Sequence, residues 1–364
     1  MNVRAAAKTA RIPVAAVTAF IADAMVKCGL PDADAAKVAE LMLEADLSGA
    51  DAHGVFRLPQ YVHRLKIAST KAQPNITVNR TAPATALVDG DNGMGHLVVS
   101  RAMETAIELA RETGVAWVGM RMSNHAGAAG VYASLALKAD MIGIYAAVAN
   151  ANHMPLAGGA EPLLGTNPIA VAIPAGKEAP LVLDIATSIV SYGTIKNHRL
   201  QNKPLQGDWM VDPKTGAAVT DPQKSTGALL LPMAGYKGAG LALMIGLLAG
   251  TLNGALFGRD CVDFNAEPGK VTNTGQFVVA LDPARFQKLD TFKSEVDRHI
   301  RELRASKTLP GHAVRLPGEE RARRRADRLN NGLAVPPELL AQLDKLAAEL
   351  NIAPLRERRA DLQR

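Results

Sequence analysis

Residues 115–130 read VAWVGMRMSNHAGAAG, and this stretch joins two different local patterns. The apolar run Val115–Met120 predicts a β-strand, and Gly127–Ala139 predicts a helix that begins in the small residues Gly127-Ala128-Ala129-Gly130. Between the two patterns stands Ser123-Asn124-His125. Small residues at such a junction let a ligand approach the backbone, and the first amides of a helix have no intrahelical partners. A tight strand-to-helix turn without a ligand explains the same residues, so both interpretations stand.

The alternation of strands and helices continues on both sides of this stretch. Apolar residues at helical spacing predict helices at Pro31–Leu47, Phe56–Lys66, Ser100–Arg111 and Pro336–Asn351. Short apolar runs between turn residues predict strands at Thr85–Val88, Ile142–Ala149, Pro168–Ile173, Leu181–Asp184 and Phe277–Leu281. A further segment, Gly238–Leu252, is apolar nearly all round and predicts a mostly buried helix. Intermixed strands and helices indicate an α/β or α+β fold.

The composition of the 364 residues is that of a globular protein, with 48% hydrophobic and 21% charged residues. It excludes a disordered chain, a collagen and a small disulfide-stapled protein, and the length suggests about two domains. Cys28 and Cys261 lie far apart without metal-binding spacing, so we expect two free thiols, a reducing compartment and no metal site. The apolar run Leu241–Leu256 is too short and too interrupted for a membrane span, so we expect a cytoplasmic protein.

The 41 Lys and Arg residues outnumber the 35 Asp and Glu residues, for a net charge of +6, and much of the excess lies near the C-terminus. The basic residues there are Arg321, Arg323, Arg324, Arg325, Arg328, Arg356, Arg358 and Arg359. Such clusters can bind nucleic acid. Glu319, Glu320 and Asp327 are interleaved, however, and aromatic residues for base stacking are absent there. We therefore expect a solvated helix face and no nucleic-acid partner.

One short segment, Asp51-Ala52-His53-Gly54 followed by Arg57, carries residue types suited to acid–base chemistry. A histidine beside a glycine is accessible and exchanges a proton near neutral pH. Arg57 offers a bidentate fork to a carboxylate if the turn between it and His53 is helical. Together the two side chains suit a small acid whose carbonyl is protonated as it is reduced. A plain surface pair is the alternative interpretation.

The Gly-x-Gly-x-x-Gly fingerprint of common dinucleotide-binding folds does not occur in the sequence. The cluster Gly90–Gly95 has a different spacing and predicts a turn. Three other polar segments interrupt apolar strands and helices: Gly165-Thr166-Asn167-Pro168, Asp184-Ile185-Ala186-Thr187 and Tyr236-Lys237-Gly238. Polar loops at strand ends often line binding sites, although each of these is equally explained by turn and cap chemistry.

Taken in order, six segments spread over about Ile12 to Leu346 resemble the type 2 malate/L-lactate dehydrogenase family of NAD(P)-dependent oxidoreductases. They are Ala45–Leu58 with its His53-Gly54-Val55-Phe56-Arg57 core, Ser123–Gly130, Pro162–Pro168, Leu183–Ser188, Lys237-Gly238 and Arg315–Glu319. The resemblance implies that a largely antiparallel sheet holds NAD or NADP, which accounts for the missing fingerprint. It also implies a homodimer with active sites near the subunit interface, acting on a small-molecule carboxylate.

The resemblance further implies roles for individual residues. His53 is the expected proton donor, Arg57 the ligand of the substrate carboxylate and Thr166 a substrate contact. Asp184 is expected to be catalytic, and it shares with Asp51 the candidacy for the acid that orients His53. The expected cofactor contacts are His125, Ala126, Gly127, Ala128, Ala129, Asp184, Ile185, Ala186, Lys237, Gly238, Arg315 and Gly318. We expect one domain from residues 1–114 with 282–364, and a cofactor-binding domain from residues 115–281.

The resemblance has one departure, because the family usually has Ser where this chain has Ala52. The loss of that hydroxyl suggests a slower enzyme, a shifted substrate or a cofactor-binding protein without catalysis. Two substrate classes remain open, since 2-oxo acids and cyclic imine acids (Δ1-piperideine- or Δ1-pyrroline-2-carboxylate) both place a carboxylate next to the reducible C=O or C=N. His53 and Arg57 serve either class.

Overall fold

The computed structural model describes residues 10–359, which divide into two compact units. The first unit comprises both ends of the chain, up to Gln73 and from Gly318 onward, and the second comprises Pro74–Pro317. Residues 74–114 and 282–317, which the sequence analysis groups with the chain ends, lie in the second unit. The former supply β2, β3 and α4, which join or contact the central sheet, and the latter are hydrogen-bonded to the β6–β7 connection and to β7.

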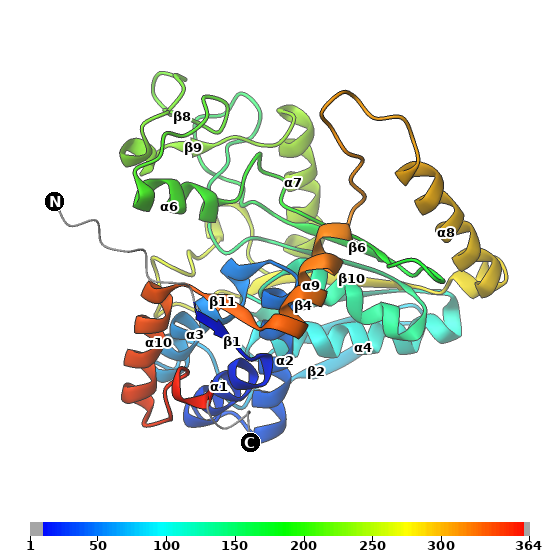
Figure 1. Cartoon of the computed structure of the whole chain (residues 1–364), viewed down its shortest axis with the longest axis horizontal. Helices are drawn as coiled ribbons and strands as arrows, with labels where there is room; N and C mark the ends of the chain where they lie inside the picture. Colours follow the sequence, from blue (N-terminus) through cyan, green and yellow to red (C-terminus); the bar gives the residue numbers. More distant parts are fainter. Residues whose placement is uncertain (1–9, 360–364) are drawn as a thin grey trace. The chain divides into compact units, whose positions relative to one another are not determined.

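The helices and strands follow one another along the whole described chain (Figure 1). The helices are α1 (Val14–Lys27), α2 (Asp32–Leu47), α3 (Leu58–Lys66), α4 (Gly95–Thr113), α5 (Ala129–Ala133), α6 (Tyr192–Gln201), α7 (Tyr236–Ala249), α8 (Leu289–Arg304), α9 (Glu319–Asn331) and α10 (Pro337–Leu350). The strands are β1 (Ala10–Ile12), β2 (Thr77–Ala82), β3 (Thr85–Asp89), β4 (Val115–Ser123), β5 (Ile142–Ala147), β6 (Ile169–Ile173), β7 (Leu181–Ile185), β8 (Met210–Val211), β9 (Leu229–Leu230), β10 (Thr274–Leu281) and β11 (Leu333–Val335). None of the helices within residues 10–359 has the length and apolarity that crossing a membrane requires.

The first unit is a helical cluster that brings the two ends of the chain together. Strand β1 pairs antiparallel with β11, with Ala10 opposite Val335. Helices α1 and α2 pack against each other, and α1 also contacts α10. Helix α2 begins after Pro31 with Asp32 and Asp34 in its first turn, where negative charge is favourable, and it ends before Gly49 at a φ of +84°.

The second unit is built on a seven-stranded sheet in the order β2-β3-β4-β10-β5-β6-β7. Only β3 and β4 pair in parallel, and every other neighbouring pair is antiparallel. The prediction of a largely antiparallel sheet is therefore confirmed. Helices α4 and α5 lie on one face, where Ala133 and Ala136 approach Gly143 closely. Helix α7 covers part of the other face through Ile245 and Ala249.

Helix α7 differs from its prediction as a mostly buried helix, because only one of its faces is covered. The covered face carries mainly small residues, and at Gly246 a Cβ would lie 2.0 Å from the ring of Phe257. Several larger apolar side chains point away, so that Tyr236 is 71% exposed and Met244 is 50% exposed, whereas Ile245 is buried. Apolarity on all sides of a helix does not reveal which side the glycines and alanines allow to approach a sheet.

Helix α8 is attached to the β6–β7 connection through one buried carboxylate. Asp297 Oδ1 accepts hydrogen bonds from the amides of Gly176 (2.9 Å) and Glu178 (3.2 Å), and Oδ2 accepts one from Lys177 (2.7 Å). These amides hold the pKa of Asp297 below its ordinary value because they stabilise the charged form. Arg304 adds an ion pair to Glu178 at 3.0 Å.

We expect D297A to release α8 and to lower the melting temperature, because three amides lose their common acceptor. The hydrogen-exchange rate of residues 174–180 should rise in D297A. In D297N, which keeps one acceptor oxygen, this rate should be intermediate between those of D297A and the native protein. The native protein should exceed D297A in stability by the full amount at neutral pH. This difference in stability should shrink as pH falls below about 4, the ordinary pKa of an aspartate, and on through the lower pKa of folded Asp297, since the unfolded chain then binds more protons. An advantage that grows on acidification would contradict this account.

Candidate active site

The end of strand β7 gathers several of the segments that the sequence analysis assigns to cofactor binding. Asp184 is exposed on β7, and its Oδ2 accepts a hydrogen bond of 2.8 Å from the amide of Gly130 at the start of α5. This bond joins Asp184 to the segment that contains His125, Ala128 and Ala129. The strand-to-helix junction of residues 115–130 therefore lies beside β7.

Two further segments meet at Thr187, just beyond β7. Its amide and its Oγ1 both donate to the carbonyl of Thr166, at 3.0 and 3.1 Å. Its carbonyl accepts from Met233 N at 2.9 Å, and a Cβ on Gly238 would lie 2.8 Å from the same carbonyl oxygen. Because only glycine fits at position 238, the first turn of α7, with the exposed Lys237, lies beside Thr166 and the end of β7.

The segment that contains Arg315 lies along the other part of β7. The amide of Val182 donates to the carbonyl of Pro317 at 3.2 Å, and the Arg315 side chain is exposed. Gly318 has a φ of +96° and precedes α9, and it begins the C-terminal segment of the first unit. Its neighbour Arg315 belongs to the second unit.

His125 lies half-buried in the turn before α5. Its ring is tilted against that of Phe264, with centroids 5.5 Å apart, and its Nδ1 accepts from Gly127 N at 3.4 Å. Gly127 adopts a φ of +85°, which glycine reaches without steric cost. The carbonyl of Ala126 accepts from the hydroxyl of Tyr132, so the turn is fixed against α5.

His53 and Arg57 lie in the first unit, on two consecutive 3-10 turns that connect α2 to α3. The turns are η1 (Asp51–His53) and η2 (Val55–Arg57). The Arg57 guanidinium donates through Nε to the carbonyl of Ala52 (3.0 Å) and through Nη1 to Oε1 of Gln60 (2.6 Å). The intervening turn is helical, as the expected role of Arg57 requires, and both side chains are half-buried.

Burial and then the positive charge of Arg57 lower the pKa of His53 to about 4. The imidazole is therefore neutral at pH 7, the form that accepts a proton. A negative group bound to Arg57 would remove part of this penalty and favour the imidazolium.

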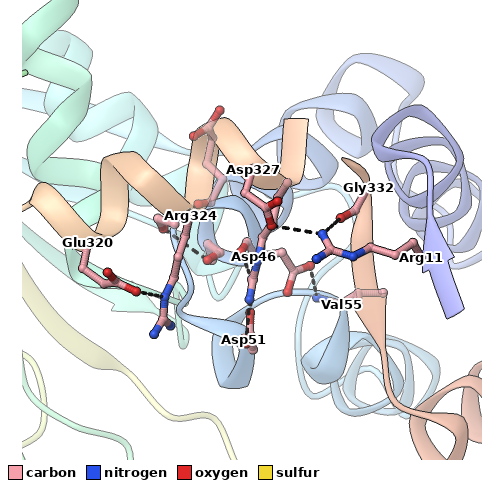
Figure 2. A network of polar contacts seen from close by, with 12 residues as sticks. Arg11, Asp46, Asp51, Val55, Glu320, Arg324, Asp327 and Gly332 are labelled. Carbon is pink, nitrogen blue, oxygen red and sulfur yellow. Dashed lines mark hydrogen bonds and ion pairs between the residues drawn. The ribbon is translucent and has the colours of Figure 1, made fainter. Parts of the chain in front are cut away.

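Sequence reasoning missed two residues that hold this connection, Asp46 and Arg328, and Figure 2 labels Asp46 with its neighbours Val55 and Asp51. Asp46, at the end of α2, is 4% exposed, and its Oδ2 accepts from Val55 N at 2.8 Å. Arg328 of α9 donates to the carbonyl of Asp46 and binds both carboxylate oxygens of Asp51. The sequence could have revealed Asp46, because it is a carboxyl among the apolar residues on the buried side of α2. It could not have revealed Arg328, which is one of several arginines in the same segment.

The predicted site residues therefore form two groups, one around β7 in the second unit and one on the α2–α3 connection in the first. The first group contains Thr166, Asp184, Gly238 and the segment 125–130. The second contains His53 and Arg57, with Asp51 held by Arg328. Among residues 10–359, three or more His, Cys, Asp or Glu side chains do not gather as metal ligands would. Both cysteines are free.

A family model described as malate/L-lactate dehydrogenase matches residues 12–344. The chain belongs to this family. Malate/(S)-sulfolactate dehydrogenase of Methanothermus fervidus is 35% identical over 324 residues, which are 89% of this chain and 93% of that protein. Δ1-Pyrroline-2-carboxylate reductase of Ancylobacter novellus is 32% identical over 339 residues, 92% of this chain and 97% of that protein.

Among solved structures, sulfolactate dehydrogenase from Methanocaldococcus jannaschii is similar with a TM-score of 0.87. It is 34% identical, and the match covers 96% of this chain and 99% of that one. The family member described here is thus an oxidoreductase with the mixed α/β fold of its relatives, as the resemblance implied.

Proposed function

We propose that the protein transfers a hydride between a nicotinamide cofactor and C2 of a small 2-hydroxy or 2-oxo acid. The observation that carries the proposal is the pairing of His53 and Arg57 on the ten-residue connection between α2 and α3, residues 48–57. Arg57 is held by Ala52 O at 3.0 Å and Gln60 Oε1 at 2.6 Å, so its guanidinium is already oriented. An oriented guanidinium beside an imidazole suits a carboxylate next to a carbonyl.

The chain's residues have separate tasks in this reaction. Arg57 clamps the carboxylate of the acid and thereby orients its C2 atom. His53 gives a proton to the carbonyl oxygen during reduction and takes the hydroxyl proton during oxidation. Thr166 is a proposed substrate contact. Asp51 and Asp184 both stay candidates for assisting His53: Asp51 has both oxygens bound by Arg328, and Asp184 Oδ2 accepts from Gly130 N.

The residues around β7 fit a dinucleotide. Gly235 precedes α7 with open space where a Cβ would stand, and the exposed Lys237 follows in the first turn. The N-terminal end of a helix together with a lysine suits a pyrophosphate. His125–Ala129, Asp184–Ala186 and Arg315 with Gly318 are the other proposed contacts. When bound, the reduced nicotinamide supplies the hydride. NAD and NADP both remain candidates.

The experiment that tests the proposal follows absorbance at 340 nm with NADH and NADPH separately. The acids are oxaloacetate, pyruvate, sulfopyruvate and longer 2-oxo acids, because curated relatives are malate and sulfolactate dehydrogenases. Turnover of one acid that disappears in a His53 variant supports the proposal. Absence of turnover over the whole panel, with cofactor bound in a titration, would overturn it.

A cyclic imine acid is the second candidate substrate, favoured by the similarity to a Δ1-pyrroline-2-carboxylate reductase. The carboxylate of such a compound suits Arg57, and His53 would protonate the ring nitrogen instead of an oxygen. The same assay with Δ1-pyrroline- and Δ1-piperideine-2-carboxylate distinguishes the classes, since kcat/KM should be higher for one of them by well over tenfold.

Ala52 provides a test of the third interpretation, a cofactor-binding protein without catalysis. We expect A52S to change kcat/KM by about ten- to a hundredfold at most, since one hydroxyl contributes about 1–3 kcal/mol. Ala52 is exposed, so the new hydroxyl causes no packing strain. A gain of many orders of magnitude on every acid would show instead that the native site has lost its activity.

We also propose that the protein is a homodimer, and the uncovered face of α7 supports this. Large apolar side chains at positions 236, 244, 247 and 248 of α7, and at 252 in the turn after it, are each at least 40% exposed within the isolated chain. Exposed large apolar side chains gathered on one helix are typical of a subunit interface. Light scattering should give twice the mass of 38.3 kDa for the native protein and a shift toward monomer for L248E with M244E.

A further inference from the structure

The connection that carries His53 and Arg57 has little structure of its own. It consists of two 3-10 turns of three residues each, η1 and η2. Short 3-10 turns have poor hydrogen-bond geometry and are stabilised by their surroundings. Within the connection, His53 N donates to Ala50 O at 2.8 Å and Arg57 N donates to Gly54 O at 2.9 Å. Neither bond attaches the connection to the rest of the unit.

Asp46 attaches it from the buried side. Its carboxylate accepts from the amide of Val55, the residue between His53 and Arg57, at 2.8 Å. The packing is so close that a Cβ on Gly54 would lie 1.9 Å from Asp46 Oδ1. The backbone on both sides of the Gly54–Val55 bond is therefore fixed by one side chain that is 4% exposed.

Arg328 attaches the connection from α9. It donates to the carbonyl of Asp46 and grips the Asp51 carboxylate with both Nη atoms, two residues before His53. Its side chain is only 17% exposed, although it stands in an arginine-rich helix. Figure 2 shows that Asp327 beside it binds Arg11, which also donates to Gly332 O, so that this part of α9 is itself held by the N-terminal strand.

We propose that Asp46 and Arg328 are positioning residues that hold the His53–Arg57 backbone in the conformation in which both side chains act. This inference rests on the proposed function. Asp46 fixes the Val55 amide, and Arg328 fixes the start of η1 at Asp51. Neither touches the substrate in this account.

The test compares D46A, D46N, R328Q and R325Q with the native protein. Arg325 provides a matched control, because it joins the same two helices through Glu44 (2.8 and 3.1 Å) without touching the connection. We expect D46A and R328Q to lower kcat/KM by about ten- to a hundredfold, the effect of leaving a buried polar partner unsatisfied. D46N, whose amide oxygen still accepts from Val55 N, should recover most of the loss, and R325Q should stay within about threefold of the native value.

Hydrogen exchange of residues 51–58 gives a readout that is independent of turnover. D46A and R328Q should expose the Val55 amide, while R325Q should not, and titration with NADH should give an unchanged Kd for all four variants. Equal losses in R328Q and R325Q would overturn the inference and leave only a general role in docking α9. An unchanged exchange rate of the Val55 amide in R328Q would also overturn the inference. R328Q keeps the test decisive if D46A, which alters a buried residue, does not fold. If the native protein turns over no acid, the proposed function fails while the exchange data still decide the positioning role.

Discussion

Replacing His53 by Ala should lower kcat for reduction of the preferred 2-oxo acid by about a hundred- to ten-thousandfold, the usual contribution of a general acid–base group. The Kd for NADH should stay within about twofold, because the residues around β7 that we assign to the cofactor belong to the second unit. Steady-state kinetics and a fluorescence titration measure the two quantities on the same sample.

The control for this variant is H63A. His63 lies in α3, ten positions after His53. It is exposed and takes no part in the proposed site. Its loss should leave kcat unchanged. If H53A retains more than about a tenth of the native kcat, His53 is not the proton donor.

The pH dependence of native kcat/KM should differ between the two directions. Because burial and Arg57 lower the pKa of His53 to about 4, the free enzyme holds the neutral imidazole at pH 7. Reduction needs the imidazolium, so its kcat/KM should fall as pH rises above that value. Oxidation needs the neutral ring, so its kcat/KM should fall only as pH drops toward 4. Profiles with the opposite slopes would exclude His53 from proton transfer.

Replacing Arg57 by Gln should raise KM for the acid and lower kcat/KM by roughly 30- to 4,000-fold, equivalent to about 2–5 kcal/mol for truncating one partner of a charge pair. R57K should recover only part of this, since an ammonium cannot make the bidentate contact. The measurement is the ratio of kcat/KM for a 2-oxo acid to that for its methyl ester. This ratio should collapse in R57Q.

The control for R57Q is Q60A, which removes the side chain that holds Nη1 of Arg57 at 2.6 Å. Because the positive charge of Arg57 remains, Q60A should lower kcat/KM for the acid by at most about tenfold. A ratio of acid to ester that R57Q leaves unchanged would show that the carboxylate binds elsewhere.

The strands of the sheet were predictable because their local patterns are strong. Val115–Met120 and Leu181–Asp184 are short apolar runs between turns, and they form β4 and β7 with ends within three residues of the prediction. The pair His53 and Arg57 was singled out from residue type and spacing, and its role in the reaction stays a prediction. Information of this kind is local.

The support of the site was not predictable, because it depends on contacts between distant parts of the chain. Arg328 and the carbonyl of Asp46 are 282 positions apart. In the sequence, Arg328 is one of several arginines that predict a solvated helix face, and Arg323 with Arg324 does pair with Glu320 on that face. Only the packing of α9 against α2 shows which arginine turns inward.

The exposed side of α7 illustrates the same limit. A helix that is apolar all round predicts burial, but burial depends on which elements cover it. Here most of the glycines and alanines are buried, and Met244 and Leu248 are exposed.

The pairing of β1 with β11 has a consequence for the order of events during synthesis. The second unit is one continuous stretch, Pro74–Pro317, whereas the first needs segments from both ends of the chain. On the ribosome, the sheet can therefore form before α9, β11 and α10 have been synthesised, when the helices up to α3 still lack these packing partners. His53 acquires its surroundings only after Arg328 has been translated, so a nascent chain with a finished central sheet still lacks the contacts that hold the His53–Arg57 connection.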